Sequence, residues 1–568
     1  MPAGQGFWYV EGLKSTLVEP SMAGNPKFGQ AASGSPGFAA IKNVDDAWNW
    51  LDFLADHLLD ESSFLRTNMM PVGFLRLREQ SVESPSTSEP TEHCSLKDIT
   101  KMLSPFAKCY TTLSANTVNR VDNLGLQKLW CAQAVNLVGC EEAKQKGGIG
   151  ALSQHGVYMP WRATNANASF ADSGFQDIIG DMATYSSQGF IVDYALNPDS
   201  PGVTLQTQKA AFVQELKILR EGKWISPATR AVTISFSIYN PHLDNWMSCE
   251  FLIEFPPSGQ LIPHARLRIF KPTIYETDPE IIFLWVDNMR MILFLYIVIV
   301  LMPRGYFHKT MFRRAGALYF LSVGGISDVC AILAYATQAY TMYGLHPFRS
   351  ETTTKYVQKL KNVEVLDNAR YDYRGYIDSS PIAQGYEMIM VYDGFILFFC
   401  CVRLTTYLRL SYRIFMLWRT IGLALRNYLY VLAMYLPSLF TWVCVAHKLW
   451  GHDLKNFASM RSTHLTLLMA INGELDYGSM FDTNFGGFWT PTFMFLFYFI
   501  ILFTLMSACV ALTVDAFYTI WITGEVSIKG DMGTEKHAWS TERWMRFFFS
   551  SSATLVDSMA AEVDASKD

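Results

Sequence analysis

Two carboxylates and a glycine interrupt sequence that is otherwise strongly apolar. They lie in MAINGELDYGSM, residues 469–480, where Asn472, Gly473, Glu474 and Asp476 stand between two long apolar runs. Carboxylate and carbonyl oxygens are ligands that cations accept, so these residue types at membrane depth suit ion binding. Non-helical backbone at that depth is tolerated only where it lines water or protein. The stretch is therefore a candidate cation site.

A short helix over residues 457–471 would position this stretch. The helix is apolar but punctuated by hydroxyls, and it is too short to cross ~30 Å of hydrocarbon. Its negative end and its free carbonyls would face a central cavity and attract cations. Gly473 would let the backbone present carbonyl oxygens, and Glu474 from each subunit would form a carboxylate ring that contacts the metal ion. The competing interpretation is a surface turn after a helix.

Composition excludes several classes of protein. Half of the 568 residues are hydrophobic, 14% are aromatic and the formal net charge is −5. The pI near 6.1 gives no broad basic field, so no nucleic acid is expected as a partner. The first half has neither a P-loop nor an HExxH zinc motif, and nothing in the sequence implies catalysis or a resident cofactor.

The second half repeatedly runs for about twenty residues almost without charge, which is typical of membrane spans. The five candidate spans are residues 281–303, 315–345, 388–410, 427–450 and 488–522. The dense basic cluster of loop 304–314 suits the cytosol, although loop 346–387 also holds six Lys or Arg. A cytosolic loop 304–314 puts residues 1–280 outside and the C-terminus inside.

The first half has the mixed pattern of a water-soluble α+β domain. We expect a poorly structured lead-in over 1–40, helices over 44–60 and 207–221, and a loop over 80–93. Apolar residues alternate with small polar ones from Val232 to Ile238, which predicts a strand. FLIEFPPSG, residues 251–259, predicts a second strand that ends in a turn. The N-terminus lacks the basic head and apolar core of a signal peptide.

Five of the ten cysteines lie in the first half of the chain, residues 1–280, and five lie in the apolar runs of the second half. Close pairs in a domain that faces an oxidising compartment predict two disulfides, with Cys249 left free. The pairs are Cys94–Cys109 and Cys131–Cys140. The cysteines of the apolar runs are interpreted as small packing residues. One sequon, Asn167-Ala168-Ser169, predicts glycosylation and agrees with an exterior location.

Several segments together resemble a known family. They are TYSSQGFIVDY (184–194), TRAVTISFSIYN (229–240), LIEFPPSGQLIP (252–263) and the stretch 457–480. The first three resemble signature segments of the extracellular domain of polycystin-2-type channels, in the polycystin branch of the TRP superfamily. The fourth is similar, without gaps, to the pore helix and selectivity filter of that family. FWYVEGLKSTLVEP, residues 7–20, resembles the outer end of the first of six spans, so that span is either truncated from this sequence or absent.

The resemblance implies an α-helical membrane protein with a voltage-gated-like channel fold and an extracellular α+β polycystin domain. The implied parts are a lead-in over 1–40, the polycystin domain over 41–280, voltage-sensor-like spans over 281–425, a pore domain over 426–522 and a cytosolic tail over 523–568. The family's longer members carry an EF-hand and a heptad repeat after the pore, and the tail shows neither pattern.

The resemblance also implies roles for residues of the pore. Asn472, Gly473 and Glu474 would form the filter, with Asp476 and Asp482 in the outer vestibule. Vertebrate polycystin-2 usually has an apolar residue in place of Asn472 and an aspartate in place of Glu474. These departures leave open the order of selectivity among sodium, potassium and calcium.

The resemblance also implies a lower gate near the end of the last span, at Val510 and Val514. Val510 and Val514 lie four apart, on one helix face, where the family usually has a leucine and an asparagine. An apolar ring can close a pore by dewetting, whereas ordinary packing of two valines is the competing interpretation. Asp515 would collect cations at the inner mouth.

Charges within the other apolar runs need partners, because a buried acid costs about 2.5–3.5 kcal/mol on insertion scales. Asp328 is such an acid, and Arg403 and Arg409 of the next span are the candidate partners, with Arg413 following off register. The resemblance implies a weak voltage sensor here. The alternative is that these charges only hold the helices together.

The first functional hypothesis is a subunit of a tetrameric, calcium-permeable, non-selective cation channel, either a homotetramer or a heteromer with polycystin-type subunits. The permeant ions would be calcium, sodium and potassium. The second is a polycystin-1-like receptor or assembly subunit that conducts little, and the third is a membrane anchor for an extracellular glycoprotein or filament. The resemblance implies a multi-pass protein of the ciliary or flagellar membrane, the plasma membrane or the endoplasmic reticulum.

Overall fold

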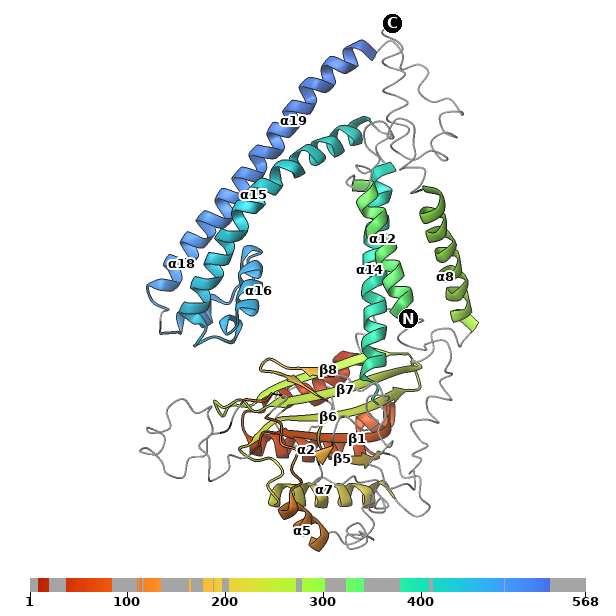
Figure 1. Ribbon diagram of the computed structural model, residues 1–568, viewed down its shortest axis with the longest axis vertical. Helices are drawn as coiled ribbons and strands as arrows, with labels where there is room; N and C mark the ends of the chain where they lie inside the picture. Colours follow the sequence, from red (N-terminus) through yellow and green to blue (C-terminus); the bar gives the residue numbers. More distant parts are fainter. Residues whose placement is uncertain are drawn as a thin grey trace. The chain divides into compact units, whose positions relative to one another are not determined.

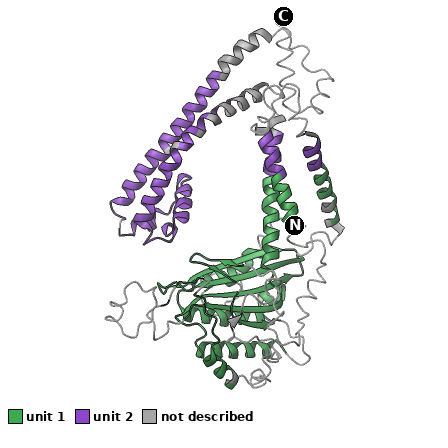
Figure 2. Ribbon diagram, viewed as in Figure 1, with its two compact units in different colours: residues 1–292, 333–396 green, residues 293–332, 397–568 purple. Residues whose placement is uncertain are grey.

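The computed structural model describes residues 9–19, 37–83, 110, 112–114, 117–133, 163–164, 177–186, 188–196, 204–271, 278–301, 323–341, 378–407, 412–484 and 486–531. The chain forms two compact units (Figure 2). Unit 1 comprises residues 1–292 and 333–396, and unit 2 comprises residues 293–332 and 397–568.

Unit 1 contains a six-stranded sheet in which every neighbouring pair is antiparallel (Figure 1). Its strands are β1 (Met70–Ser81), β2 (Ala163–Thr164), β5 (Gly189–Ala195), β6 (Thr229–Asn240), β7 (Asn245–Glu254) and β8 (Ile262–Phe270), in the order β2-β5-β1-β6-β7-β8. A short separate hairpin pairs β3 (Ile178–Ile179) with β4 (Thr184–Tyr185). The three strands that follow one another from β6 to β8 form a meander, as the alternation and turn signals predict.

Two long helices, α2 (Val44–Leu59) and α7 (Leu205–Glu221), cover one face of the sheet (Figure 1). Both predicted helices are confirmed. The side chain of Asn43 caps α2 by accepting a hydrogen bond of 2.8 Å from the N–H of Asp46, whose carboxylate accepts from the N–H of Asn43 in return. Shorter helices are α3 (Phe64–Asn68) and α5 (Leu124–Gln133).

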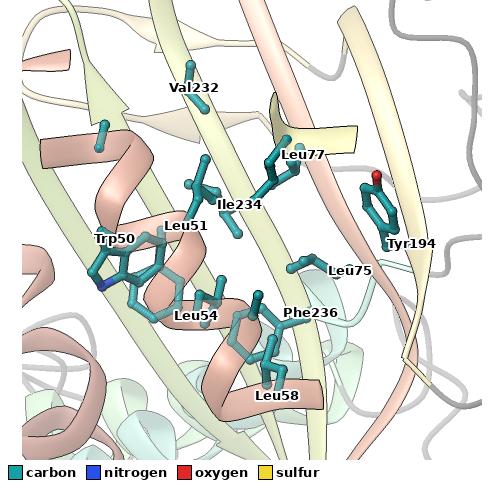
Figure 3. Packing of buried hydrophobic residues seen from close by; sticks show 14 of the residues in the cluster. Trp50, Leu51, Leu54, Leu58, Leu75, Leu77, Tyr194, Val232, Ile234 and Phe236 are labelled. Carbon is teal, nitrogen blue, oxygen red and sulfur yellow. The ribbon is translucent and has the colours of Figure 1, made fainter. Parts of the chain in front are cut away.

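The core of this domain lies between α2 and the central strands. Figure 3 shows Trp50 and the leucines of α2 against apolar side chains of β1 and β6. Those side chains are the ones that alternate toward one face of each strand, among them Leu75, Leu77, Val232, Ile234 and Phe236. Full burial of each large apolar side chain contributes about 1.5–3 kcal/mol, so this face holds the domain together.

Strand β1 is the central element that the sequence pattern did not predict, and it includes residues 80 and 81 of the expected loop. Its last four residues, 78–81, are polar, yet the strand lies between β5 and β6. Arg76 is buried and forms a two-pronged ion pair with buried Asp193 of β5, with Nε–Oδ1 and Nη2–Oδ2 distances of 2.8 and 2.7 Å. Such pairing makes two charges tolerable inside a sheet, but only the folded neighbour shows it.

Part of the lead-in is more ordered than the sequence prediction of a poorly structured 1–40. Residues 9–18 are helical, the last five of them as the π-helix η1 (Lys14–Val18). Tyr9, Leu13 and Leu17 are buried in the same core as α2, and the indole N–H of Trp50 donates to the carbonyl of Leu17 at 3.1 Å. The apolar spacing of four residues within a Gly-rich segment was the available signal.

The described residues after β8 are mostly helical. Their elements are α8 (Asp278–Tyr296) with η4 (Ile297–Leu301), α12 (Val323–Tyr340), α14 (Ser380–Tyr407), α15 (Tyr412–Trp450), η7 (Lys455–Phe457), α16 (Met460–Ile471), α17 (Tyr477–Phe481), α18 (Trp489–Phe497), η8 (Tyr498–Phe503) and α19 (Thr504–Asp531). Helix α14 begins eight residues before the predicted span at 388, because its first turns pack on the sheet: Ala383 contacts Trp246 and Phe270, and the Ser379 and Ser237 hydroxyls are 2.7 Å apart. Helix α15 likewise begins at Tyr412, well before 427.

Two helical stretches of the described residues are long and apolar enough to cross a membrane, Tyr430–Trp450 and Trp489–Thr519. Only 18% and 12% of their most apolar windows are buried inside the structure, whereas a core helix of a water-soluble protein is mostly buried. Helices α8, α12 and α14 overlap the other three predicted spans, whose membrane crossing stays a prediction.

Candidate ion-conduction site

The short helix expected before the acidic stretch is α16, twelve residues from Met460 to Ile471. At 1.5 Å per residue it is about 18 Å long, which is too short to span a bilayer. Its first turn is capped by Ser459, whose hydroxyl accepts from the N–H of Ser462 at 3.1 Å. The Thr463 and Thr466 hydroxyls donate to the carbonyls of Phe457 and Asn456, both at 3.1 Å. The hydroxyls that punctuate this apolar helix therefore anchor it to the turn before it.

Helix α16 ends in a Schellman motif. Gly473 follows the C-cap residue Asn472 and has a φ of +88°, the left-handed region that favours glycine. The N–H of Gly473 donates to the carbonyl of Ala470 at 3.0 Å, and the N–H of Glu474 donates to the carbonyl of Met469 at 3.1 Å. A Cβ at position 473 would have nothing within 4 Å, so backbone conformation and not crowding requires the glycine.

This ending corrects one part of the sequence-based account. The carbonyls of Met469 and Ala470 were expected to be free and to face a cavity, but the two N–H groups of the motif already satisfy them. Ala470 also accepts from the hydroxyl of Tyr498 in η8 at 2.8 Å. The Tyr498 hydroxyl in turn lies 2.7 Å from that of Tyr477. The end of α16 is therefore fastened to the last long helix.

Glu474 itself is exposed, as are Asn472 and Gly473. Among the residues that the structure describes, no hydrogen bond or ion pair engages its carboxylate. An exposed carboxylate directly after a rigid turn is available to a cation, which a carboxylate held in a salt bridge would not be.

The two aspartates predicted for the vestibule have different surroundings. Asp476 is the N-cap of α17, and its carboxylate accepts from the N–H of Ser479 at 3.2 Å. It therefore has a structural role that the sequence reasoning did not include. Asp482 follows the end of the same short helix and is exposed.

The gate candidates lie on α19. Val510 and Val514 are 57% and 46% exposed within the single chain, so packing inside one subunit does not account for these valines. Asp515 is exposed as well, whereas the next residue, Ala516, is buried. Another face of α19 is tied to α15 by the Tyr428 hydroxyl, which donates to the carbonyl of Cys509 at 3.0 Å.

In unit 2 the structure brings Asp328 of α12 and Arg403 of α14 together. The Arg403 Nη2 to Asp328 Oδ2 distance is 3.4 Å, and Asp328 is buried. Arg409 lies outside the described residues. Arg413 belongs to the first turn of α15 and not to α14, because a new helix begins at Tyr412.

A second charged cluster, in unit 1, was missed by the sequence reasoning. Arg290 of α8 forms an ion pair with Asp393 of α14 and another with Asp287, at 2.9 Å. Gln338 of α12 donates to the same Asp393 carboxylate at 2.7 Å. Three helices thus share one polar cluster. The available signal was the presence of Arg290 and Asp393 inside apolar runs, where each charge needs a partner.

Most residues predicted for covalent modification fall outside the described part of the chain. Asn167, Cys94, Cys109 and Cys140 lie in undescribed segments, and Cys131 belongs to α5 without a described side chain. Cys249 is a buried free thiol, as the sequence pairing left it.

Comparison with known proteins agrees with this architecture. The family model "Polycystin domain" matches residues 37–272, and the model "Polycystin cation channel" matches residues 285–520. Polycystin-2-like protein 1 of Homo sapiens is 22% identical over 325 residues, which cover 57% of this chain and 36% of that protein. Polycystin-2 of Danio rerio is 21% identical over 57% of this chain and 32% of that protein. Polycystin-1-like protein 1 of Homo sapiens is 26% identical over 128 residues, which cover 18% of this chain and 4% of that protein.

A sheet domain followed by apolar helices and a capped half-helix is the architecture of a membrane protein of the cation-channel class. The chain belongs to the polycystin family, and its similarity is to polycystin-2-like channel subunits. The family places the sheet domain outside the membrane and the helical part within it. This chain spans about a third of the length of the two polycystin-2-type relatives compared.

Proposed function

We propose that this chain is the pore-forming subunit of a tetrameric, calcium-permeable, non-selective cation channel with weak voltage sensitivity. Asn472, Gly473 and Glu474 form the filter, Asp476 and Asp482 line the outer vestibule, Val510 and Val514 form the lower gate, and Asp515 lies at the inner mouth. Calcium, sodium and potassium are the permeant ions. The chain works as a homotetramer or together with other polycystin-type subunits.

One observation carries the proposal. Glu474 is exposed and lies directly after the fixed end of a 12-residue helix, between the two candidate membrane spans found among the described residues. Lipid would not tolerate an unpaired carboxylate there, so the group must face water or ions. Four copies around one axis would provide four carboxylates, which concentrate divalent cations more strongly than monovalent ones.

The voltage-sensor-like helices support only a shallow response to voltage. Arg403 carries one positive charge on α14, but Asp393 carries a negative charge on the same helix. Each charge that crosses the whole membrane field contributes about 2.3 kcal/mol per 100 mV. Charges of opposite sign that move together largely cancel, so the net contribution of α14 is small.

The experiment is Glu474→Gln in the full chain, reconstituted in liposomes or expressed for electrophysiology. Removing the carboxylate should reduce divalent permeation, shift the reversal potential when external sodium is replaced by calcium, and weaken block by external multivalent cations. Glu474→Asp keeps the charge and should retain divalent permeation. Asp453→Asn removes an exposed carboxylate from the turn that precedes α16 and serves as the matched control. Unchanged reversal potentials in Glu474→Gln would refute the filter assignment.

The similarity to a polycystin-1-like protein favours one alternative, a receptor or assembly subunit with little conduction of its own. That match covers less than a fifth of this chain, against more than half for the polycystin-2-type relatives. Cation flux through liposomes that contain only this chain separates the two functions. Flux supports the channel, and its absence in protein of tetrameric native mass supports the assembly subunit.

A further inference from the structure

Three side chains that commonly bind metals meet at one end of the sheet in unit 1, far in sequence from the conduction site. They are Asp181, Glu254 and His264, and their ligand atoms all lie within 4.8 Å of one another. The His264 Nε2 atom is 2.8 Å from Glu254 Oε2 and 3.6 Å from Asp181 Oδ2. None of the functions proposed above uses these residues.

The fold brings the three together from separate elements. Glu254 is the last residue of β7, and His264 of β8 pairs with Leu252, two residues earlier on β7. Side chains two residues apart along a strand point to the same face, so His264 and Glu254 are diagonal neighbours on one face of the sheet. Asp181 comes from the turn between β3 and β4. Neighbouring Gly180 permits this approach, because a Cβ there would overlap the Glu254 carboxylate.

Glu254 is a preformed anionic ligand. Its carboxylate is fully buried, and burial alone would favour the neutral acid. Hydrogen bonds from His264, from the Tyr185 hydroxyl and from two backbone N–H groups compensate for burial and stabilise the charged carboxylate. The two N–H donors are those of Asp181 and Met182, both at 3.0 Å, and the Tyr185 hydroxyl is at 2.7 Å.

The cluster is open on one side. The side chains of His264 and Asp181 are 23% and 62% exposed, so an ion can reach both from solvent. Two ligands at 2.0–2.1 Å from a tetrahedral zinc ion lie about 3.3 Å apart. The distances of 2.8 and 3.6 Å from His264 Nε2 to the two carboxylates bracket that separation. Small side-chain rotations are therefore enough to form the site.

We propose that Asp181, Glu254 and His264 bind a zinc-type divalent transition-metal ion, with solvent in the fourth position. The imidazole sets the class of metal, because calcium and magnesium prefer ligand sets made only of oxygen, whereas zinc accepts nitrogen and oxygen together.

Binding rearranges one proton. In the metal-free arrangement His264 Nε2 lies 2.8 Å from the Glu254 carboxylate, and because a charged carboxylate can only accept, this contact requires a hydrogen on Nε2. The Nε2 lone pair needed by the metal is therefore not yet available. A neutral His264 moves that proton to Nδ1 through solvent, and an imidazolium releases one proton to solvent. Glu254 loses one hydrogen bond and gains a bond from oxygen to the metal, while its other three donors stay in place.

The bound ion would fasten the β3–β4 hairpin to β7 and β8. The hairpin has two residues in each strand, and β3 and β4 form a separate two-stranded sheet, so it has little stability of its own. A metal that bridges Asp181 to the sheet adds a strong connection across this edge of the domain.

The test uses the full-length protein in detergent, titrated with Co²⁺ as a spectroscopic substitute for zinc and then with Zn²⁺ as competitor. Wild type should show a visible d–d absorption of low-symmetry Co²⁺ with one equivalent per chain, and Zn²⁺ should abolish it. His264→Gln should weaken binding at least about tenfold, since even partners outside the ligand set contribute 10–100-fold to metal affinity. His242→Gln, which changes an exposed histidine of the β6–β7 turn, should bind like wild type.

A second variant keeps the result decisive if His264→Gln disturbs folding. Asp181→Asn changes an exposed side chain and retains the backbone N–H that donates to Glu254. It should leave the thermal unfolding midpoint of the metal-free protein unchanged and should weaken Co²⁺ binding. Absence of a Co²⁺ band in wild type, or equal bands in wild type and Asp181→Asn, would overturn the site, whatever the outcome of the flux experiments on Glu474.

Discussion

Gly473 offers the sharpest test of the filter geometry, because its backbone φ of +88° is the feature that only glycine adopts without cost. An alanine in the left-handed region costs about 1–2 kcal/mol. Nothing lies within 4 Å of the added Cβ, so no steric term adds to this cost. The expected loss of local stability is therefore about 1–2 kcal/mol, a factor of roughly 5–30 in the population of the opened end of α16.

Hydrogen exchange measures this opening directly. The amides of Gly473 and Glu474 are bonded to the carbonyls of Ala470 and Met469, so both exchange only when the motif opens. In Gly473→Ala their exchange should accelerate about 5–30-fold. Gly473→Asn should accelerate less, because asparagine tolerates the left-handed region better. Cation flux should fall in the same order.

Gly487→Ala is the matched control. Gly487 also has open space around its Cβ position but no positive φ. Its alanine variant should exchange and conduct like wild type. Equal exchange in Gly473→Ala and Gly487→Ala would show that the Schellman end does not fix the filter, and the geometric argument would fail.

Two further predictions concern buried charges. Burial raises the pKa of Glu79 to about 8, so the folded domain retains a proton that the unfolded chain releases near pH 4.5. The stability of the domain should fall as pH rises from about 4.5 to 8, by up to about 4–5 kcal/mol. In Glu79→Gln the dependence of the thermal midpoint on pH should weaken but not vanish, because burial also raises the pKa values of Asp193, Glu215 and Glu250. Exposed Glu83→Gln should retain the whole dependence, and an unchanged slope in Glu79→Gln would contradict the assignment. For the Asp328–Arg403 pair, Asp328→Asn and Arg403→Gln should each destabilise the protein by about 3–5 kcal/mol, and the double variant by less than the sum. Additive losses in that double-mutant cycle would show that the two charges act independently.

The local spacing of apolar residues was sufficient to predict an element where one buried face of a helix or strand decides its structure. Helices α2 and α7 follow from apolar residues at helical spacing and from capping residues, and β6 follows from its alternation. Helix α16 ends at Ile471, as predicted, because the Asn-Gly pair after it favours a left-handed C-terminal cap.

The local sequence pattern did not predict elements whose buried residues need a partner from a distant part of the chain. Strand β1 contains the buried charged residues Arg76 and Glu79, and the sequence pattern did not predict it. Their partners come from other strands: β5 supplies Asp193, and β6 supplies the hydroxyl of Thr229, which donates to Glu79 at 2.8 Å. Tyr9 and Leu13 likewise belong to a Gly-rich lead-in whose order depends on the core that they enter.

The sequence by itself determined the family, the run of apolar helices and the glycine that ends the half-helix, because these depend on residue type and short spacing. The tertiary structure decided which groups around that end are available. The carbonyls of Met469 and Ala470 are occupied, whereas Glu474 is exposed. It also decided that Arg290, Gln338 and Asp393 share one cluster and that His264 faces Glu254. Hydrogen bonds and ion pairs form between atoms a few ångströms apart, and only the folded chain sets those distances.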